Sequence, residues 1–184
     1  IRDVERSRGL GDVYKRQAVY MGANKLETVK ILLDAGASID YRTFTGSTVL
    51  SNAVGNEDSD PNVVRLVLEK LKNSLCAKEF ISIVNYKRTS TTLKWKGIYS
   101  VAKMLYRTGV SKGGLMKSLA IDSGTTALNL AVVRGDIEIV KILLDYGADP
   151  YVENDLGMNA FEICDKSGPF PNVRTVLEEH DKKQ

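Results

Sequence analysis

Histidine and cysteine are nearly absent from this chain, whose 184 residues contain only His180, Cys76 and Cys164. A single histidine excludes a His-rich metal site and argues against a His-based catalytic triad. The two cysteines lie 88 positions apart without a CxxC motif, which favours buried residues in a reducing compartment over a disulfide framework. These absences favour binding over chemistry, and we expect neither a metal nor a cofactor.

Long apolar runs and a signal peptide are missing too. No run reaches the ~18 apolar residues of a membrane span. With 43% hydrophobic and 27% charged residues, the composition is typical of a soluble globular domain. A domain of this length buries roughly 70% of its unfolded surface without disulfides. We expect a cytoplasmic location, with a nuclear one as the alternative.

The first seventeen residues are polar and show no periodicity. They resemble a translated adapter sequence, and a flexible tail is the alternative. Because the chain starts with isoleucine, we expect it to be a fragment of a longer reading frame. The predicted fold therefore begins at residue 18.

Internal repetition is the strongest signal. The segment VKILLDAGA at 29–37 returns as VKILLDYGA at 140–148, and each is followed at the same distance by a glycine, Gly46 or Gly157. A third such glycine, Gly124, precedes Gly157 by 33 residues. A fixed offset of this size indicates a repeat architecture.

Each unit reads Gly-x-Thr-x-Leu-x-x-Ala, a polar turn, and a second apolar helix ending in Leu-Leu-x-x-Gly-Ala. This pattern resembles the ankyrin repeat, most closely at residues 121–153. The resemblance implies an all-α solenoid of stacked helix pairs joined by short β-hairpin fingers. A single pair cannot bury both of its faces, so each repeat depends on its neighbours.

Individual residue types fit this interpretation. The hydroxyl of Thr126 can cap an inner helix. Val140, Leu143 and Leu144 share one face of the outer helix. Gly147 suits the left-handed position that ends that helix. These positions should therefore form the buried interface between units.

The spacing of the units is irregular, because the match at 121–153 comes 45 residues late. One repeat and a short insertion would account for this delay. Thr91-Thr92-Leu93 would then start an inner helix, and Val101–Gly109 would align with an outer one. We favour five repeats with a degenerate, basic third, and the alternative is a basic helical insertion. The predicted repeats are 18–42, 43–75, 80–120, 121–153 and 154–184.

Charge is unevenly distributed. Residues 71–122 contain ten Lys or Arg against Glu79 and Asp122, a net charge of +8, whereas the regular repeats carry −7. This separation favours an anionic partner at the centre or contact between two copies of the chain. The basic segment is represented by Lys94, Trp95, Lys96, Lys103 and Arg107.

Within this segment an apolar helix face is predicted, and it has three competing interpretations: packing in the stack, docking on an anionic membrane, or capture by a partner groove. Burying four large apolar side chains is worth about 6–12 kcal/mol, against about 1 kcal/mol for each cation near anionic lipid. Packing is therefore favoured. The predicted face comprises Trp95, Ile98, Tyr99, Ala102, Leu105 and Tyr106.

Two further signals are weak. Aromatic residues interleave with lysines as in a nucleic-acid platform, but most of them fit one helix face, so nucleic-acid binding is disfavoured. The run Gly109-Val-Ser-Lys-Gly-Gly114 is followed by Leu115 instead of the lysine of a phosphate loop. No phosphate-binding site is predicted.

We conclude that the sequence predicts a non-enzymatic protein-recognition module or adaptor. The alternatives are a regulatory fragment of a larger enzyme and an anionic-surface binder using residues 71–122. The resemblance implies binding through finger tips and the concave inner-helix face, and the partner itself is not specified. The candidate residues are Arg42, Phe44, Thr45, Asn52, Val133, Arg134, Glu153, Asp155 and Leu156.

Overall fold

The computed structural model describes residues 25–35, 39, 42–56, 58–110, 114–168 and 170–183. The predicted leader and the start of the first repeat at 18–24 lie outside the described residues. Within these residues every regular element is a helix, and the pairing of Arg42 with Thr48 is an isolated antiparallel bridge. The predicted all-α class is confirmed.

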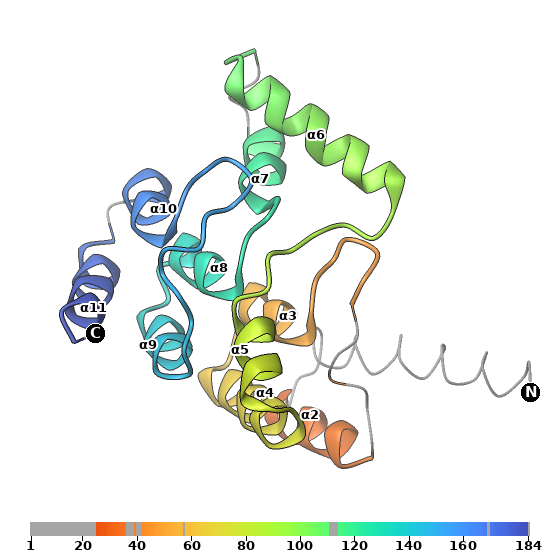
Figure 1. The fold of residues 1–184 in the computed structure, drawn as a ribbon, viewed down its shortest axis with the longest axis vertical. Helices are drawn as coiled ribbons and strands as arrows, with labels where there is room; N and C mark the ends of the chain where they lie inside the picture. Colours follow the sequence, from red (N-terminus) through yellow and green to blue (C-terminus); the bar gives the residue numbers. More distant parts are fainter. Residues whose placement is uncertain are drawn as a thin grey trace, which may run out of the picture.

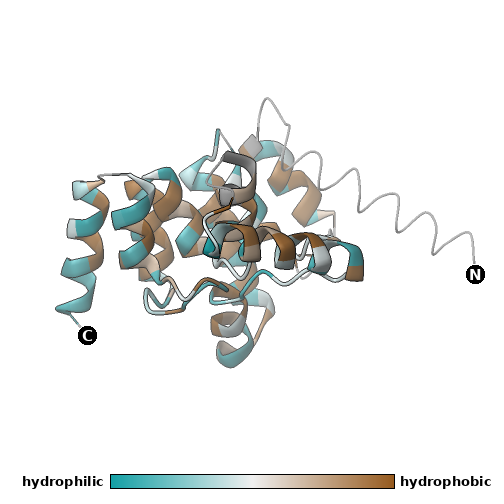
Figure 2. Ribbon diagram, turned by 90° about the horizontal axis from the view of Figure 1, so that it is seen from above, coloured by the Kyte–Doolittle hydropathy of each residue, from teal (hydrophilic) through white to brown (hydrophobic). Residues whose placement is uncertain are grey.

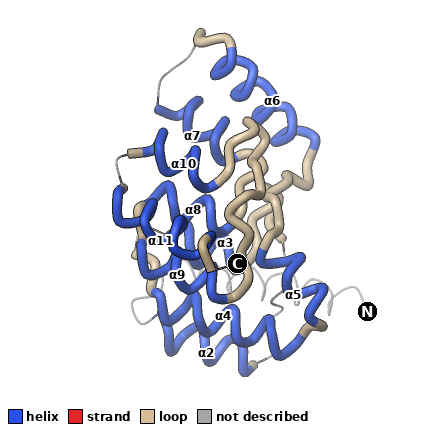
Figure 3. The backbone as a smooth tube through the Cα atoms, turned by 60° about the vertical axis from the view of Figure 1, so that its left-hand side comes forward, coloured by secondary structure: helices blue, strands red, loops and turns tan. Residues whose placement is uncertain are grey.

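The helices form two adjacent layers that stack along one direction (Figures 1 and 3). In the inner layer α3 packs against α8 and α8 against α10, and in the outer layer α4 lies between α2 and α9, with α11 beyond α9. This is the predicted solenoid. The inner helices are α3 (Val49–Gly55), α8 (Ala127–Arg134) and α10 (Ala160–Ser167); the outer helices are α2 (Lys25–Asp34), α4 (Pro61–Ser74), α9 (Ile137–Asp145) and α11 (Pro171–Asp181).

The inner helices begin at equivalent capping residues, Thr48, Thr126 and Asn159. In each case the side-chain oxygen accepts a hydrogen bond from the backbone amide three residues later, which satisfies a donor that the helix leaves unpaired. The outer helices α4 and α9 are capped by Asp60 and Asp136, whose carboxylates accept hydrogen bonds from the amides of Asn62 and Ile139. The repeated sequence thus specifies repeated helix starts.

The core lies between the two layers. Leu143 and Leu144 of α9 are buried, as the periodicity predicted. Cys164 is also buried, at the position that Ala53 and Ala131 occupy in the other units, and burial raises the pKa of its thiol. Figure 2 shows apolar and polar stretches alternating along the helices, as expected when each buries one face.

Three further helices lie between α4 and α8 in the chain: α5 (Ala77–Val84), α6 (Leu93–Arg107) and α7 (Gly114–Asp122). α6 and α7 pack against each other to one side of the stack, next to the inner layer (Figure 1), while α3 and α4 contact α8 and α9 directly. The structure differs here from the predicted degenerate repeat at 80–120. Because no turn separates Leu93 from Arg107, the proposed inner and outer helices form one continuous helix. We interpret this arrangement as an insertion, and the repeat boundaries and the total number of repeats stay predictions.

Candidate functional site

Within the described residues three fingers connect the helix pairs, and all three use the same hydrogen bonds. In the first finger the amide of Thr43 donates to the carbonyl of Ser47, and the amide of Gly46 donates to the carbonyl of Thr43, both at 2.9 Å. The same pair of bonds recurs twice more along the chain. The equivalent residues are Arg88, Gly124 and Thr125 in the middle finger and Asn154, Gly157 and Met158 in the last.

This register locates the insertion. Between the paired residues, the first finger has Phe44-Thr45 and the last has Asp155-Leu156, whereas the middle finger has residues 89–123. That stretch contains α6 and α7 and has 35 residues instead of two, an excess of 33. The excess equals the repeat length, which explains why the spacing suggested a hidden repeat.

Helix α6 lies against the tips of the two neighbouring fingers. At its start, the ring of Trp95 lies 5.9 Å from that of Phe44 and 6.0 Å from that of Tyr99. Towards its end, the ammonium of Lys103 lies 2.8 Å from a carboxylate oxygen of Asp155, and Arg107 donates to the Asp155 carbonyl at 3.0 Å. The insertion therefore occupies much of the finger-tip surface.

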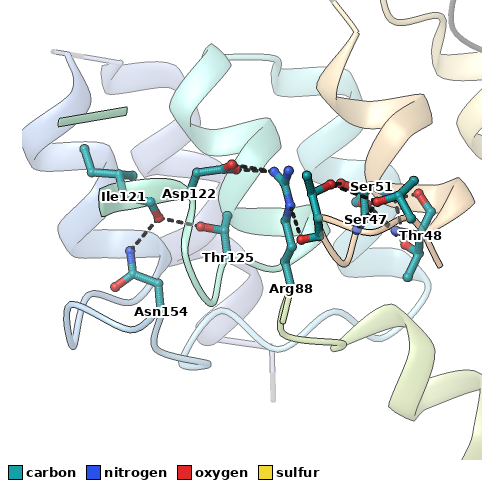
Figure 4. Close-up of polar contacts among 10 residues, drawn as sticks. Ser47, Thr48, Ser51, Arg88, Ile121, Asp122, Thr125 and Asn154 are labelled. Atoms are coloured by element: carbon teal, nitrogen blue, oxygen red, sulfur yellow. Dashed lines mark hydrogen bonds and ion pairs between the residues drawn. The ribbon is translucent and has the colours of Figure 1, made fainter. Parts of the chain in front are cut away.

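A partly buried polar cluster holds the two ends of the insertion, next to Arg88 and Gly124 (Figure 4). Arg88 donates to both carboxylate oxygens of Asp122 at 2.5 Å and to the carbonyl of Thr45 at 3.4 Å. The hydroxyl of Tyr99 also hydrogen-bonds to Asp122. Burial raises the pKa of Asp122 above its ordinary value, although Arg88 and Tyr99 oppose this rise. Through these contacts α6 and α7 are joined to the first and middle fingers.

Neighbouring fingers approach each other too closely for a side chain at two glycines. Gly46 and Gly124 have φ angles of +85° and +74°, which glycine adopts readily. A Cβ atom on Gly46 would collide with the backbone of Thr89, and one on Gly124 would collide with Asp155. The repeated glycines therefore permit both the turn and the contact between fingers.

The predicted finger residues differ in what they contact. The guanidinium of Arg42 lies 4.2 Å from the ring centroid of Tyr86, and Thr45 shares a 2.8 Å hydroxyl contact with Thr43. Phe44 remains 57% exposed despite its contact with Trp95. The other three candidates lie on the last finger: Glu153 is exposed, Asp155 binds α6, and Leu156 is partly buried.

The predicted concave residues lie on inner helices of adjacent units. Asn52 of α3 and Val133 of α8 are partly buried, and Arg134 donates to the carbonyl of Gly55 at 3.4 Å. The bond links the ends of α3 and α8. The structure thus brings together three candidates from segments about 80 positions apart in the chain.

The residues of the basic segment differ in their contacts: some pack inward, some bind Asp155, and some remain exposed. The predicted apolar face of α6 packs inward, where Tyr99 and Ala102 are buried. Lys94 and Lys96 are exposed, and among the described residues neither forms an ion pair. Trp95 is partly buried, and Lys103 and Arg107 bind Asp155.

Sequence reasoning missed the residues that anchor the insertion. Arg88, Asp122 and Ser123 belong to no repeat motif, and Ser123 donates to the carboxylate of Asp155 at 2.6 Å. Ser123 lies directly before the repeat glycine Gly124, and this position was the one signal in the sequence that could have identified it as a finger residue. Among the residues that the structure describes, no group of side chains has the arrangement of a metal site, and no helix is long and apolar enough to cross a membrane.

The chain resembles known proteins in both sequence and fold. A family model for ankyrin repeats (three copies) matches residues 16–184. A mitochondrial disaggregase of Bos taurus is 30% identical over 162 residues, covering 88% of this chain and 23% of that protein. A putative ankyrin repeat-containing protein of Treponema pallidum (strain Nichols) is 29% identical over 148 residues, covering 78% of this chain and 44% of the relative. The chain therefore spans less than half the length of either relative.

The fold has a solved counterpart in the crystal structure of the yeast ribosomal protein Rps3 in complex with its chaperone Yar1. A chain of that structure superposes with a TM-score of 0.61 and 21% sequence identity, covering 96% of this chain and 94% of the other. At this identity the likeness concerns the fold alone.

Proposed function

The chain belongs to the ankyrin-repeat family, and from this membership we propose that it recognises another protein and has no active site of its own. Ankyrin repeats are protein–protein interaction modules whose stacked units present an extended concave surface. The partner is a matter for experiment, because one repeat fold serves many ligands.

The observation that best supports this proposal is the direct packing of α3 against α8. This packing brings the two inner helices that carry Asn52 and Val133 side by side, and the Arg134–Gly55 hydrogen bond links their ends. Val133 supplies an apolar contact, and Asn52 and Arg134 supply polar groups. Apolar anchors surrounded by polar groups are typical of protein interfaces.

The fingers contribute less of this surface than the sequence suggested. Arg42 and Asp155 already bind Tyr86 and Lys103 within the chain. Phe44 keeps more than half of its surface exposed and can serve as an aromatic anchor beside α6. We therefore propose that a partner contacts the inner helices and Phe44 together.

Affinity capture with matched variants tests the proposal. Asn52→Arg/Val133→Arg places two long charged side chains on the inner-helix face and should abolish capture of specific partners. Phe44→Ser/Leu156→Ser tests the finger contribution separately. The control Glu138→Arg/Lys141→Glu changes exposed residues of the outer helix α9 and should leave capture intact. Equal capture by all these variants would contradict the proposal.

A second candidate function is that of a regulatory recognition segment within a larger multidomain enzyme. The observation that favours it is the short share of each relative that the chain covers, 23% and 44%. Extending the reading frame at the source transcript tests it directly. A further catalytic domain in frame would support this candidate, and stop codons close to both ends would contradict it.

A further inference from the structure

The outward face of α6 carries large apolar side chains that are more than half exposed. Leu93 is 87% exposed, Val101 56% and Met104 67%. Their spacing of eight and eleven residues from Leu93 places all three on one side of the helix. Val110, just beyond the helix, is exposed as well. We call Leu93, Val101 and Met104 the outer apolar stripe.

Cations border this stripe. Lys94 and Lys96 are exposed and, among the described residues, pair with no carboxylate. Arg107 is also exposed, and its observed bond is to the backbone carbonyl of Asp155, which does not neutralise its charge. The stripe and these three cations together form a basic, apolar surface that is complementary to an anionic one.

The position and shape of this surface distinguish between occupants. α6 lies at one extremity of the longest axis of the molecule (Figure 1), so a planar surface can contact it while the acidic repeats stay behind. Gly97 lies on the same side of the helix, and no atom comes within 4 Å of where its Cβ would be. The stripe is therefore interrupted and makes no continuous ridge for a preformed protein groove, whereas fluid acyl chains can fill the gap.

We propose that the outer face of α6 docks on an anionic phospholipid surface. This goes beyond the proposed protein recognition and uses different residues. It also differs from the membrane interpretation based on sequence, which used the opposite face around Trp95 and Tyr99, because that face is packed against the fingers and α7. The helix lies on the lipid surface and does not cross it.

Vesicle co-sedimentation of the full chain tests the proposal. Wild-type protein should bind vesicles of mixed phosphatidylserine and phosphatidylcholine, more weakly at high salt, and should not bind phosphatidylcholine alone. Lys94→Glu/Lys96→Glu should lower binding roughly 30-fold or more, since two cations are lost. Leu93→Ser/Met104→Ser should lower it as well, because the apolar contribution disappears. All four positions are exposed, so circular dichroism should show an unchanged fold.

The matched control is Lys30→Glu/Lys141→Glu, which makes the same change in charge at exposed positions of α2 and α9. It should retain most binding. No binding by the wild type, or equal losses in the control and the Lys94→Glu/Lys96→Glu variant, would overturn the proposal. Binding of an acidic amphipathic peptide in place of vesicles would overturn it in favour of a protein partner. The Asn52→Arg/Val133→Arg variant should bind vesicles normally, which separates this test from that of protein recognition.

Trp95 is the only tryptophan and reports which face is used. Docking through the outer face leaves Trp95 beside Phe44 and Tyr99, so its emission should stay unchanged on adding vesicles. A strong blue shift would mean that α6 detaches and inserts its inner face, which contradicts the proposal.

Discussion

The ammonium group of Lys103 on α6 lies 2.8 Å from a carboxylate oxygen of Asp155, at the tip of the last finger. These residues are 52 positions apart and join the insertion to a neighbouring repeat. The same carboxylate accepts a hydrogen bond from Ser123, at the base of the insertion. Asp155 is therefore a shared anchor for α6 and for the last residue of the inserted segment.

A double-mutant cycle measures this anchor. Lys103→Met and Asp155→Asn should each loosen α6, and their coupling should be about 0.5–1 kcal/mol, because the pair is partly exposed and screened. Hydrogen exchange of the α6 amides gives the free energy of local opening. Additive effects with no coupling would mean that the two side chains do not meet in solution.

The pKa values of Asp122 and Asp155 are shifted in opposite directions. Burial tends to raise the pKa of Asp155, but hydrogen bonds from Lys103 and Ser123 and the charge of Lys103 bring it below 3.8 overall. Its contribution to stability is therefore present above pH 3.8 and is lost as the pH falls through the lowered pKa. Burial raises the pKa of Asp122, so its contribution weakens as the pH rises through that raised value.

Carboxyl-carbon NMR with assigned aspartates checks this order. Asp122 should titrate at a higher pH than Asp155, and Lys103→Met should move the Asp155 pKa upward. The reverse order would contradict the positions described for α6 and α7.

Truncation of the outer-helix core should be costly. Leu143→Ala and Leu144→Ala should each lower the free energy of unfolding by roughly 2–5 kcal/mol, because both side chains are buried between α9 and its neighbours. The control Lys141→Ala changes an exposed residue of the same helix and should have little effect. Losses below about 1 kcal/mol at both leucines in denaturant titrations would conflict with a close-packed interface.

Glycine substitutions should have effects of opposite sign at two sites. Gly46→Ala should be destabilising, since its φ is +85° and the new methyl group would meet the backbone of Thr89. Gly97→Ala should stabilise the chain by about 0.5–1 kcal/mol, because Gly97 lies in open space within α6. Thermal melts of both variants provide the comparison, and destabilisation by Gly97→Ala would mean that α6 is not helical there.

Local patterns predicted the regular repeats well. Thr126 caps α8, and Leu143 and Leu144 are buried, because these features depend on neighbours at fixed distances in the chain. The inward packing of Tyr99 was also predicted from helical spacing. The position of the insertion could not be predicted, because it depends on the backbone pairing of Arg88 with Gly124 and Thr125 across 35 residues. An arginine at position 88 does not indicate that the residue begins a finger. The binding roles of Arg42, Asn52 and the other candidates stay predictions.

The most direct test of the fold concerns the middle finger. Replacing residues 89–123 by Asp-Leu, the dipeptide at the same position of the last finger, removes α6 and α7 and restores a two-residue turn between Arg88 and Gly124. If α3 and α4 pack directly on α8 and α9, the shortened chain should retain a single cooperative unfolding transition with a helical signal reduced only by the missing segment. Loss of cooperative unfolding would show that residues 89–123 are part of the stack, and would contradict the account.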